Sequence, residues 1–220
     1  MTQHLLLATH NEHKRREFAR LFADGGEGAS WEIAALPTEV ILPPEDGATF
    51  AENALGKARA AAAATGRASI ADDSGIEAAA LGGAPGVRSA RYAGENASDG
   101  QNLQKLVREA PAGSALEYVC AIAYVEESGS LERVFEGRCS GRMAAEPRGE
   151  RGFGYDPVFL PDESLAPDGH SLADERSPGD GSPAALTMAE LSDEQKDAIS
   201  HRGRAARALL AWLTAPSKEG

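Results

Sequence analysis

Residues 68–75 read Ala-Ser-Ile-Ala-Asp-Asp-Ser-Gly, an apolar run that leads into two acidic residues and a glycine. Short apolar runs bounded by turn residues are typical of buried β-strands. We therefore expect a strand at 68–72 and a sharp polar turn at 73–75. Because open α/β sheets bind ligands at the carboxyl ends of their strands, the two carboxylates mark a candidate site.

The segments on either side alternate between strand and helix patterns. Strand patterns at 5–8 and 31–36 alternate with helix patterns at 12–22 and 49–65, and the second helix carries a capping box, Thr49-x-x-Glu52, and a terminal Gly66. The remaining elements are a helix near 99–109, two strand-like runs at 116–125 and 131–142 that predict a hairpin, and two short helices after residue 192. This order predicts an α/β fold, with a mixed central sheet flanked by helices.

Composition and charge exclude several classes of protein. The chain has 220 residues and a net charge of −12, which argues against a surface that binds polymeric nucleic acid or an anionic membrane. Cys120 and Cys139 lie 19 residues apart without a CxxC pair, so we expect neither a zinc site nor a disulfide scaffold. With no signal peptide and no long apolar run, we expect a cytoplasmic protein.

The domain organisation is predicted to be a single domain over residues 1–220. The stretch 161–183 is rich in proline, glycine, serine and acidic residues. Such a composition cannot bury enough apolar surface to order itself, so 161–185 is predicted to be a mobile loop insertion.

The first strand-to-helix junction carries polar side chains suited to phosphate. Thr9, Asn11 and Lys14 lie where unpaired backbone N–H groups and the helix dipole favour an anion. The alternative is an ordinary helix cap with a solvated lysine. A kinase-like nucleotide site is disfavoured, because Gly56-Lys57 lacks the Ser or Thr of a P-loop.

Asp72 and Asp73 offer a carboxylate to a reaction centre. Neighbouring strand residues point to opposite faces, so only one of the two should face the site. That carboxylate could bind a hard cation such as Mg²⁺ or deprotonate water, and Glu45 could supply a second ligand to the same cation. The alternative is an Asp-rich turn of no chemical importance.

Two later motifs suit a flat base. The run Gly152-Phe153-Gly154-Tyr155-Asp156-Pro157 combines aromatic faces with an acid, which would stack a base and bond its edge. Ser200-His201-Arg202 opens the last helix with two donors. The alternative for the aromatic run is ordinary core packing, and the alternative for His201 and Arg202 is a solvated surface.

Taken together and in order, these motifs resemble the inosine triphosphate pyrophosphatase family, also called the Ham1-like family, over nearly the full length. The matching runs are Thr9-x-Asn11-x-x-Lys14, Thr49-Phe50-Ala51-Glu52-Asn53-Ala54 with Lys57, Ala71-Asp72-Asp73-Ser74-Gly75, residues 82–92, Phe153-Gly154-Tyr155-Asp156-Pro157 and Ser200-His201-Arg202-Gly203.

The resemblance implies hydrolysis of inosine, deoxyinosine or xanthosine triphosphate to the monophosphate and pyrophosphate. It also implies two lobes around a substrate cleft, a homodimer, and Mg²⁺ as cofactor. Asp73 would be the general base and a metal ligand, and Glu45 a second metal ligand. The residues that would bind the substrate are Thr9, His10, Asn11, Glu12, His13, Lys14, Lys57, Ser74, Phe153, Gly154, Tyr155, Asp156, Lys196, His201 and Arg202.

Within this set, Arg202 is expected to select the base. Inosine and xanthosine carry a carbonyl at C6 where adenosine carries an amino group, so a permanent donor would favour the former. Guanosine shares that carbonyl, and the sequence does not identify the contact that rejects it.

The chain departs from the family pattern at one point. The family usually has a Gly-Lys-Thr shortly before the Ala-Glu-Leu run, whereas here 161–185 is lengthened and Leu186 stands where the lysine would be. The other classes that remain open are a pyrophosphatase for standard or pyrimidine nucleotides and a non-catalytic nucleotide-binding module.

Overall fold

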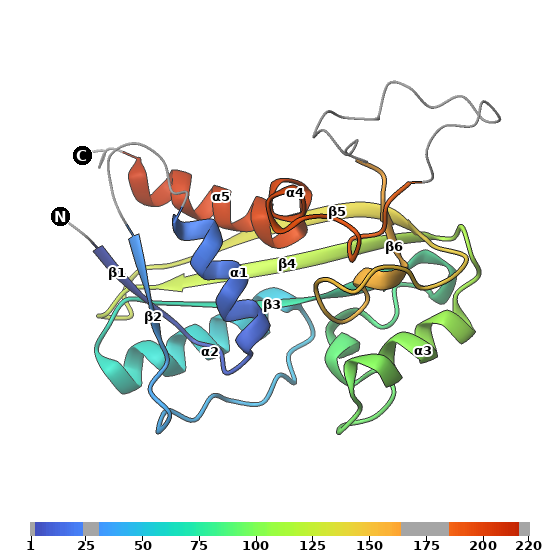
Figure 1. Cartoon of the computed structure of the whole chain (residues 1–220). Coiled ribbons are helices and arrows are strands. Elements are labelled where there is room, and N and C mark those ends of the chain that lie inside the picture. The colour runs from blue at the N-terminus through green and yellow to red at the C-terminus, as the bar shows by residue number, and fades with distance from the viewer. Residues whose placement is uncertain (1–2, 24–30, 164–184, 216–220) are drawn as a thin grey trace. The chain divides into compact units, whose positions relative to one another are not determined.

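The computed structural model describes residues 3–23, 31–163 and 185–215. Its sheet has six strands in the order β2-β1-β3-β4-β5-β6 (Figure 1). The strands are β1 (Gln3–Leu7), β2 (Trp31–Ala35), β3 (Ser69–Ala78), β4 (Ala115–Val125), β5 (Glu132–Met143) and β6 (Phe159–Pro161). β1 pairs in parallel with β2 and β3, whereas β5 and β6 are antiparallel, so the predicted α/β fold with a mixed sheet is confirmed.

Five α-helices accompany the strands in the described part of the chain. They are α1 (Glu12–Ala23), α2 (Phe50–Thr65), α3 (Asp99–Glu109), α4 (Asp193–Ile199) and α5 (His201–Thr214). The boundaries of α2 follow from the sequence as predicted: Thr49 and Glu52 form the capping box, and Gly66 ends the helix at a φ of 63°. Only glycine adopts that left-handed conformation without strain.

The chain groups into two compact units, and each unit collects segments that are far apart in the sequence. Unit 1 comprises Met1–Ser74, Cys120–Gly137 and His201–Gly220, and unit 2 comprises Gly75–Val119 and Arg138–Ser200. β3, β4 and β5 each contribute residues to both units. The assignment of residues 1–220 to a single domain stays a prediction.

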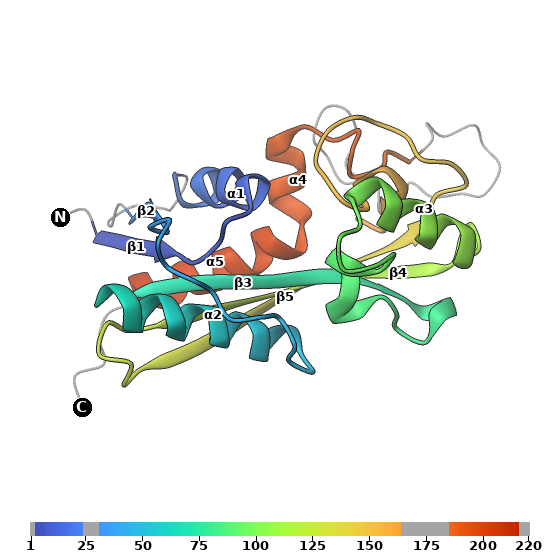
Figure 2. The same ribbon diagram turned by 90° about the horizontal axis from the view of Figure 1, so that it is seen from below.

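Unit 1 places helices on both faces of its part of the sheet. α1 and α5 lie on one face, and α2 lies on the other (Figure 2). Its core is built from β1, β3 and β4 residues and from the apolar faces of α1 and α5, among them Leu7, Phe18, Ile122 and Leu209. The polar residues at the amino ends of α1 and α5 and along α2 are thereby directed to the same stretch of β3.

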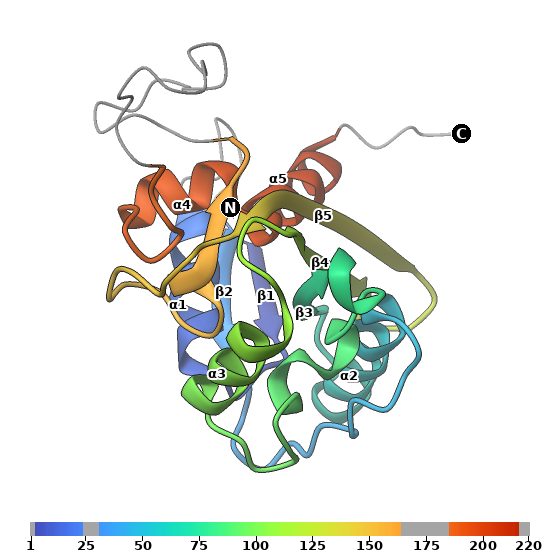
Figure 3. The same ribbon diagram turned by 90° about the vertical axis from the view of Figure 1, so that its right-hand side faces the viewer.

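Unit 2 has its own apolar core. Tyr118, Val158, Phe159, Met188 and Leu106 are buried together, and Leu106 is contributed by α3. In Figure 3, α3 lies beside the segment 86–93, and the side chain of Asn102 bonds that segment. α3 and α4 both begin with capping boxes, at Ser98 and at Ser192.

The turn predicted at 73–75 is wrong. β3 continues without interruption from Ser69 to Ala78, so Asp72 and Asp73 lie in the middle of the strand. The apolar pattern resumes at the buried residues Ile76 and Ala78, and the polar side chains between find partners from distant elements. Local sequence signals a turn at Asp-Ser-Gly, but those tertiary contacts allow a strand instead.

Two further predictions concern the segment around residues 161–186. Most of the loop predicted at 161–185 falls on residues 164–184, which lie outside the described part. Leu186, which stands in place of the family lysine, packs against the core of unit 2. In the ranges that the structure describes, no helix is long and apolar enough to cross a membrane.

Candidate functional site

Asp72 is fully buried and surrounded by cations in unit 1. Its Oδ2 atom lies 3.1 Å from the Lys14 ammonium and accepts bonds from Arg202 Nη2 (2.9 Å) and Nε (3.2 Å). Burial by itself would raise the pKa of Asp72, but Lys14, Arg202 and Lys57 together hold it well below its usual value. Asp72 is therefore ionised at neutral pH.

Arg202 lies at the beginning of α5 and is 2% exposed. Its guanidinium bonds Asp72, the Glu17 carboxylate of α1 and the Ser74 hydroxyl (2.7 Å). Although burial opposes its charge, Asp72 and Glu17 raise the pKa of Arg202. The guanidinium bonds two carboxylates because a buried arginine needs anionic partners, and its expected contact with the base stays a prediction.

Asp73 presents its side chain to α2, on the opposite face from Asp72, as strand alternation requires. Asn53 Nδ2 donates to Asp73 Oδ2 (2.8 Å), and the backbone N–H of Ser74 donates to Oδ1 (2.9 Å). Burial raises the pKa of Asp73, and Lys57 opposes this only in part. This carboxylate has no direct salt bridge among the described residues, and its affinity for a proton is increased.

Lys57 bonds both the loop that carries Glu45 and strand β3. Its ammonium bonds the Glu45 carboxylate and the backbone carbonyl of Asp72 (2.6 Å). Burial lowers the pKa of Lys57, but Asp72, Glu45 and Asp73 together outweigh that effect and raise it. Since Glu45 also raises the pKa of Asp73, the two acidic side chains are electrostatically coupled.

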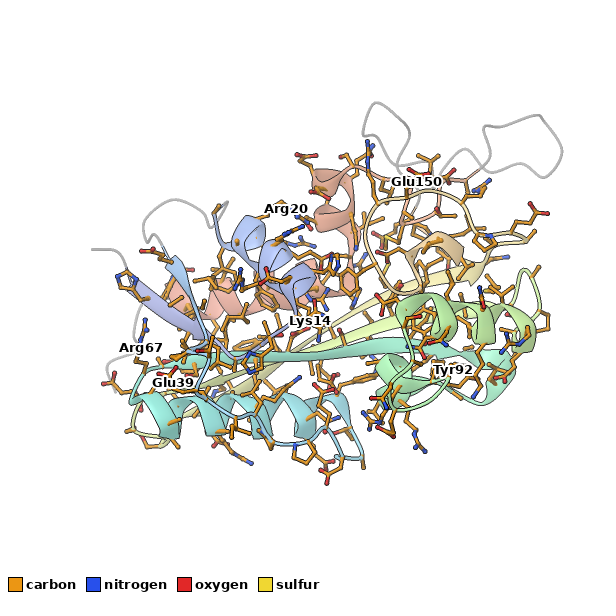
Figure 4. All side chains as sticks on the ribbon, turned by 60° about the horizontal axis from the view of Figure 1, so that its bottom comes forward. Lys14, Arg20, Glu39, Arg67, Tyr92 and Glu150 are labelled. Atoms are coloured by element: carbon orange, nitrogen blue, oxygen red, sulfur yellow. The ribbon has the colours of Figure 1, made fainter. Side chains whose placement is uncertain are left out.

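The junction before α1 is organised by its own polar side chains. Asn11 Oδ1 accepts from the backbone N–H groups of His13 (2.9 Å) and Lys14 (3.2 Å), while Thr9 accepts from Asn11 (3.2 Å). His10, Asn11, Glu12 and His13 are exposed. Lys14 lies on the side of α1 that faces the sheet (Figure 4), and its ammonium pairs with the buried carboxylate of Asp72.

Unit 2 holds a second, smaller cluster of functional side chains. Lys196 of α4 bonds Asp156 (2.7 Å), and its ammonium lies 5.1 Å from the centroid of the Phe153 ring. Asp156 also accepts from the Phe153 backbone (3.0 Å) and from the Tyr118 hydroxyl (3.1 Å). A base stacked on Phe153 would meet a cation and a fixed carboxylate.

Three other residues of the base-binding prediction have surroundings of their own, and their contact with a base stays a prediction. Tyr155 is buried in the core of unit 2, and its hydroxyl donates to the Ser89 carbonyl (2.8 Å), so its ring is packing rather than an open stacking face. Gly154 donates its N–H to Asp99 (3.1 Å). His201 is buried at the start of α5, in unit 1.

Sequence reasoning missed three residues that complete these clusters: Asn53, Glu17 and Tyr118. Asn53 stood within a quoted motif, but nothing local indicated that it would bond Asp73. Glu17 is an acid on the buried face of α1, three residues after Lys14. An acid at such a position indicates a buried cationic partner. Its partner Arg202 lies 185 residues away. Tyr118 places a hydroxyl in a buried strand, where such a group needs a partner.

Known proteins resemble this chain along nearly its whole length. A family model described as the Ham1 family matches residues 5–212. The chain belongs to the Ham1 family. Residues 5–212 include the whole set of residues named above, from Thr9 to Arg202.

Relatives in the Ham1 family match almost the whole chain. The dITP/XTP pyrophosphatases of Mycolicibacterium paratuberculosis and Mycobacterium tuberculosis are each 44% identical over 217 residues, covering 95% of this chain and 95% and 94% of theirs. Among solved structures, a HAM1 protein from Coxiella burnetii is 37% identical with a TM-score of 0.74, covering 96% of this chain and 98% of its own. The Staphylococcus aureus Ham1 protein is 36% identical with a TM-score of 0.72, at the same two coverages.

Proposed function

We propose that this chain hydrolyses the non-standard purine nucleotides dITP, ITP and XTP to the monophosphate and pyrophosphate, and so removes them from the nucleotide pool. The 44% identical relatives are named dITP/XTP pyrophosphatases and match the chain end to end. The observation that carries the proposal is the pair of neighbouring buried aspartates, one neutralised by cations and the other left with a raised pKa.

This pair fits the chemistry of a triphosphate. Phosphate oxygens repel an incoming nucleophile, so the reaction needs positive charge around the phosphates and a base for the attacking water. Lys14 and Lys57 supply the charge, and Asp73 accepts the proton of the water. The water oxygen then bonds the α-phosphorus, the bond from this phosphorus to the bridging oxygen breaks, and pyrophosphate leaves.

Magnesium fits the residues present. Mg²⁺ commonly takes one or two protein carboxylates together with substrate phosphates and water. Asp73 and Glu45 are two carboxylates whose mutual repulsion a cation would relieve, which is consistent with the raised pKa of Asp73. Among the described residues, no cluster of three or more acidic, histidine or cysteine side chains could hold a metal, so water and the substrate phosphates would supply the ligands beyond these two carboxylates. Bound there, the cation would neutralise the charge of the departing pyrophosphate.

The cluster in unit 2 suits the base. Phe153 offers a ring for stacking, and Lys196 offers an ammonium donor to a carbonyl oxygen such as that at C6 of hypoxanthine or xanthine. Adenine carries an amino group at this position and would place donor against donor. We assign this part of the selection to Lys196, because its ammonium lies beside the Phe153 ring on which the base would stack.

A substrate panel tests the proposal. Pyrophosphate release is measured with Mg²⁺ on dITP, ITP, XTP, the four standard deoxynucleotides and UTP. We expect kcat/KM for dITP and XTP to exceed that for dATP by about 10² or more. Equal rates on standard or pyrimidine nucleotides would favour a general pyrophosphatase, and binding without turnover would favour a non-catalytic module.

Magnesium dependence, assembly and location belong to the same proposal. Activity should vanish with a chelator and return with Mg²⁺. We expect a homodimer, which sedimentation of the purified chain measures. We also expect a cytoplasmic location and no affinity for polymeric nucleic acid or membranes, consistent with the net charge of −12.

A further inference from the structure

The side chain of Asn53 joins the two carboxylates that the proposed function uses. It is 5% exposed and lies in the first turn and a half of α2. Its Oδ1 accepts from the backbone N–H of Gly47 (2.8 Å), and its Nδ2 donates to Asp73 Oδ2 (2.8 Å). Gly47 is two residues after Glu45, so one amide bonds both the loop of Glu45 and the strand of Asp73.

The orientation of this amide follows from its partners. A backbone N–H can only donate, so the atom of Asn53 that faces Gly47 is the carbonyl oxygen. The amino group must then face Asp73, where it requires an acceptor. Asn53 therefore bonds Asp73 through an oxygen that carries no proton and restricts the rotation of the carboxylate.

The capping box of α2 holds Asn53 in place. Glu52 Oε2 accepts from the backbone N–H groups of Ala48 (2.7 Å) and Thr49 (3.2 Å). Together with the Gly47 bond, three consecutive N–H groups of the loop are bonded by two neighbouring side chains of α2. A Cβ on Gly47 would lie 2.7 Å from Asn53 Oδ1 and 2.9 Å from Glu52 Cβ, so the loop approaches this closely only with glycine.

Lys57 repeats the connection one helical turn later. Residues i and i+4 lie on the same face of a helix. Lys57 bonds Glu45 and the carbonyl of Asp72, whereas Asn53 bonds Gly47 and the side chain of Asp73. A bound triphosphate would compete with Glu45 for Lys57, but it has no charge-based reason to compete for the neutral Asn53.

We propose that Asn53 is a positioning residue that sets the separation of the Glu45 and Asp73 carboxylates and thereby prepares the cation site. The inference rests on the proposed function in that it assigns both carboxylates to one cation. It goes beyond that function by naming Asn53 as the group that holds the two carboxylates in place while Lys57 binds the substrate phosphates.

Asn102 provides a matched control. It is a buried asparagine of α3, 1% exposed, whose Oδ1 accepts from Ala93 (2.8 Å) and whose Nδ2 donates to the Ala90 carbonyl (3.0 Å). It also ties a loop to a helix, but it bonds no residue of either cluster. Asn102→Ala should cost stability much as Asn53→Ala does.

The experiment compares the two variants by three measurements: thermal unfolding, kcat and KM with dITP and Mg²⁺, and binding of Mn²⁺ without nucleotide. Loss of the free-ion electron paramagnetic resonance signal reports the Mn²⁺ binding. For Asn53→Ala we expect kcat to fall about 10- to 100-fold with little change in KM, because misplacing a reacting group by about 1 Å has effects of that size. Mn²⁺ binding should weaken about tenfold, while Asn102→Ala keeps both quantities within about twofold.

Gly47→Ala supplies a second variant should Asn53→Ala fail to fold. The added methyl should displace the loop and weaken Mn²⁺ binding while Asn53 still bonds Asp73. If wild type binds no Mn²⁺, or if the Asn53 and Asn102 variants behave alike in kcat and Mn²⁺ binding, the inference is overturned. Failure of wild type to hydrolyse dITP would overturn the proposed function alone, since the comparison of Mn²⁺ binding still decides the role of Asn53.

Discussion

Asp72 and Asp73 are adjacent, equally acidic and both buried, yet the two faces of β3 treat them differently. On the face of α1 and α5, Asp72 meets Lys14 and Arg202, and its pKa is held low. On the face of α2, Asp73 meets the neutral amide of Asn53, and its pKa is raised. One strand thus produces a carboxylate committed to structure and another available for chemistry.

The difference arises from where the cations come from. Lys14 and Arg202 lie near the amino ends of their helices and bond Asp72 directly. Lys57 also lies close to both aspartates, but its ammonium is bonded to Glu45 and to a backbone carbonyl. A buried charge without a bonded counter-charge keeps its desolvation cost, and in the proposed function that cost prepares Asp73 to accept a proton.

Asp73→Asn should give the largest effect on turnover. The amide can neither accept the proton of water nor balance a divalent cation, so we expect kcat for dITP to fall by about 10² to 10⁴ or more. Pyrophosphate release is the measurement. Because the charge at this position is costly, the free energy of unfolding should stay the same or rise, and a variant that kept a tenth of wild-type activity would contradict the assignment.

Asp72→Asn should act mainly on stability. The substitution leaves the buried Arg202 and the half-buried Lys14 beside a neutral group, and breaking a buried pair in this way costs about 3 to 5 kcal/mol. Urea unfolding measures it. Glu77→Gln, on the same strand, is the control: its side chain is 36% exposed, and it should change stability by no more than about 0.5 kcal/mol.

The two aspartates should also respond to pH in opposite ways. A lowered pKa means that the stability contributed by Asp72 is present above its unfolded pKa of about 3.9 and is lost as pH falls through the folded value. A raised pKa means that Asp73 costs stability as pH rises from about 3.9 through its folded value.

Urea unfolding of the metal-free protein at about pH 7 and about pH 3 checks this contrast. The destabilisation by Asp72→Asn should be full at the higher pH and smaller at the lower. Any stabilisation by Asp73→Asn should likewise be present at the higher pH and disappear at the lower. Parallel pH profiles, with both variants destabilised, would show that the two faces of β3 do not differ.

Tyr118→Phe should give the smallest effect and extends the comparison to unit 2. Asp156 is a third buried aspartate, with Lys196 as its cation and the Tyr118 hydroxyl as an added donor. Losing a bond to a charged group costs about 1.5 kcal/mol. If the Tyr118 bond holds Asp156, and through it Lys196, in the orientation that binds the base, KM for dITP should rise a few-fold at unchanged kcat. An unchanged KM would mean that the ion pair between Lys196 and Asp156 keeps this orientation without the hydroxyl.

Much of the local architecture was readable before the structure. The capping box and terminal glycine define α2 because these signals act within a few residues. Opposite faces for Asp72 and Asp73 follow from the geometry of any strand. The turn expected at 73–75 was wrong because the partners that satisfy Asp73 and Ser74 lie 20 residues upstream and 128 residues downstream in the sequence.

The α/β class, the helix boundaries and the set of polar residues follow from the amino-acid sequence alone, since periodicity, caps and motifs are local properties of the chain. Which charged side chains meet depends on the packing of elements that are far apart in the sequence. Arg202 binds Asp72 and Glu17, partners that its local sequence does not indicate, because folding brings α1, β3 and α5 together and a buried guanidinium requires carboxylates. The contrast between Asp72 and Asp73 has the same origin: their intrinsic pKa values are equal, and only the environment on each face of β3 separates them.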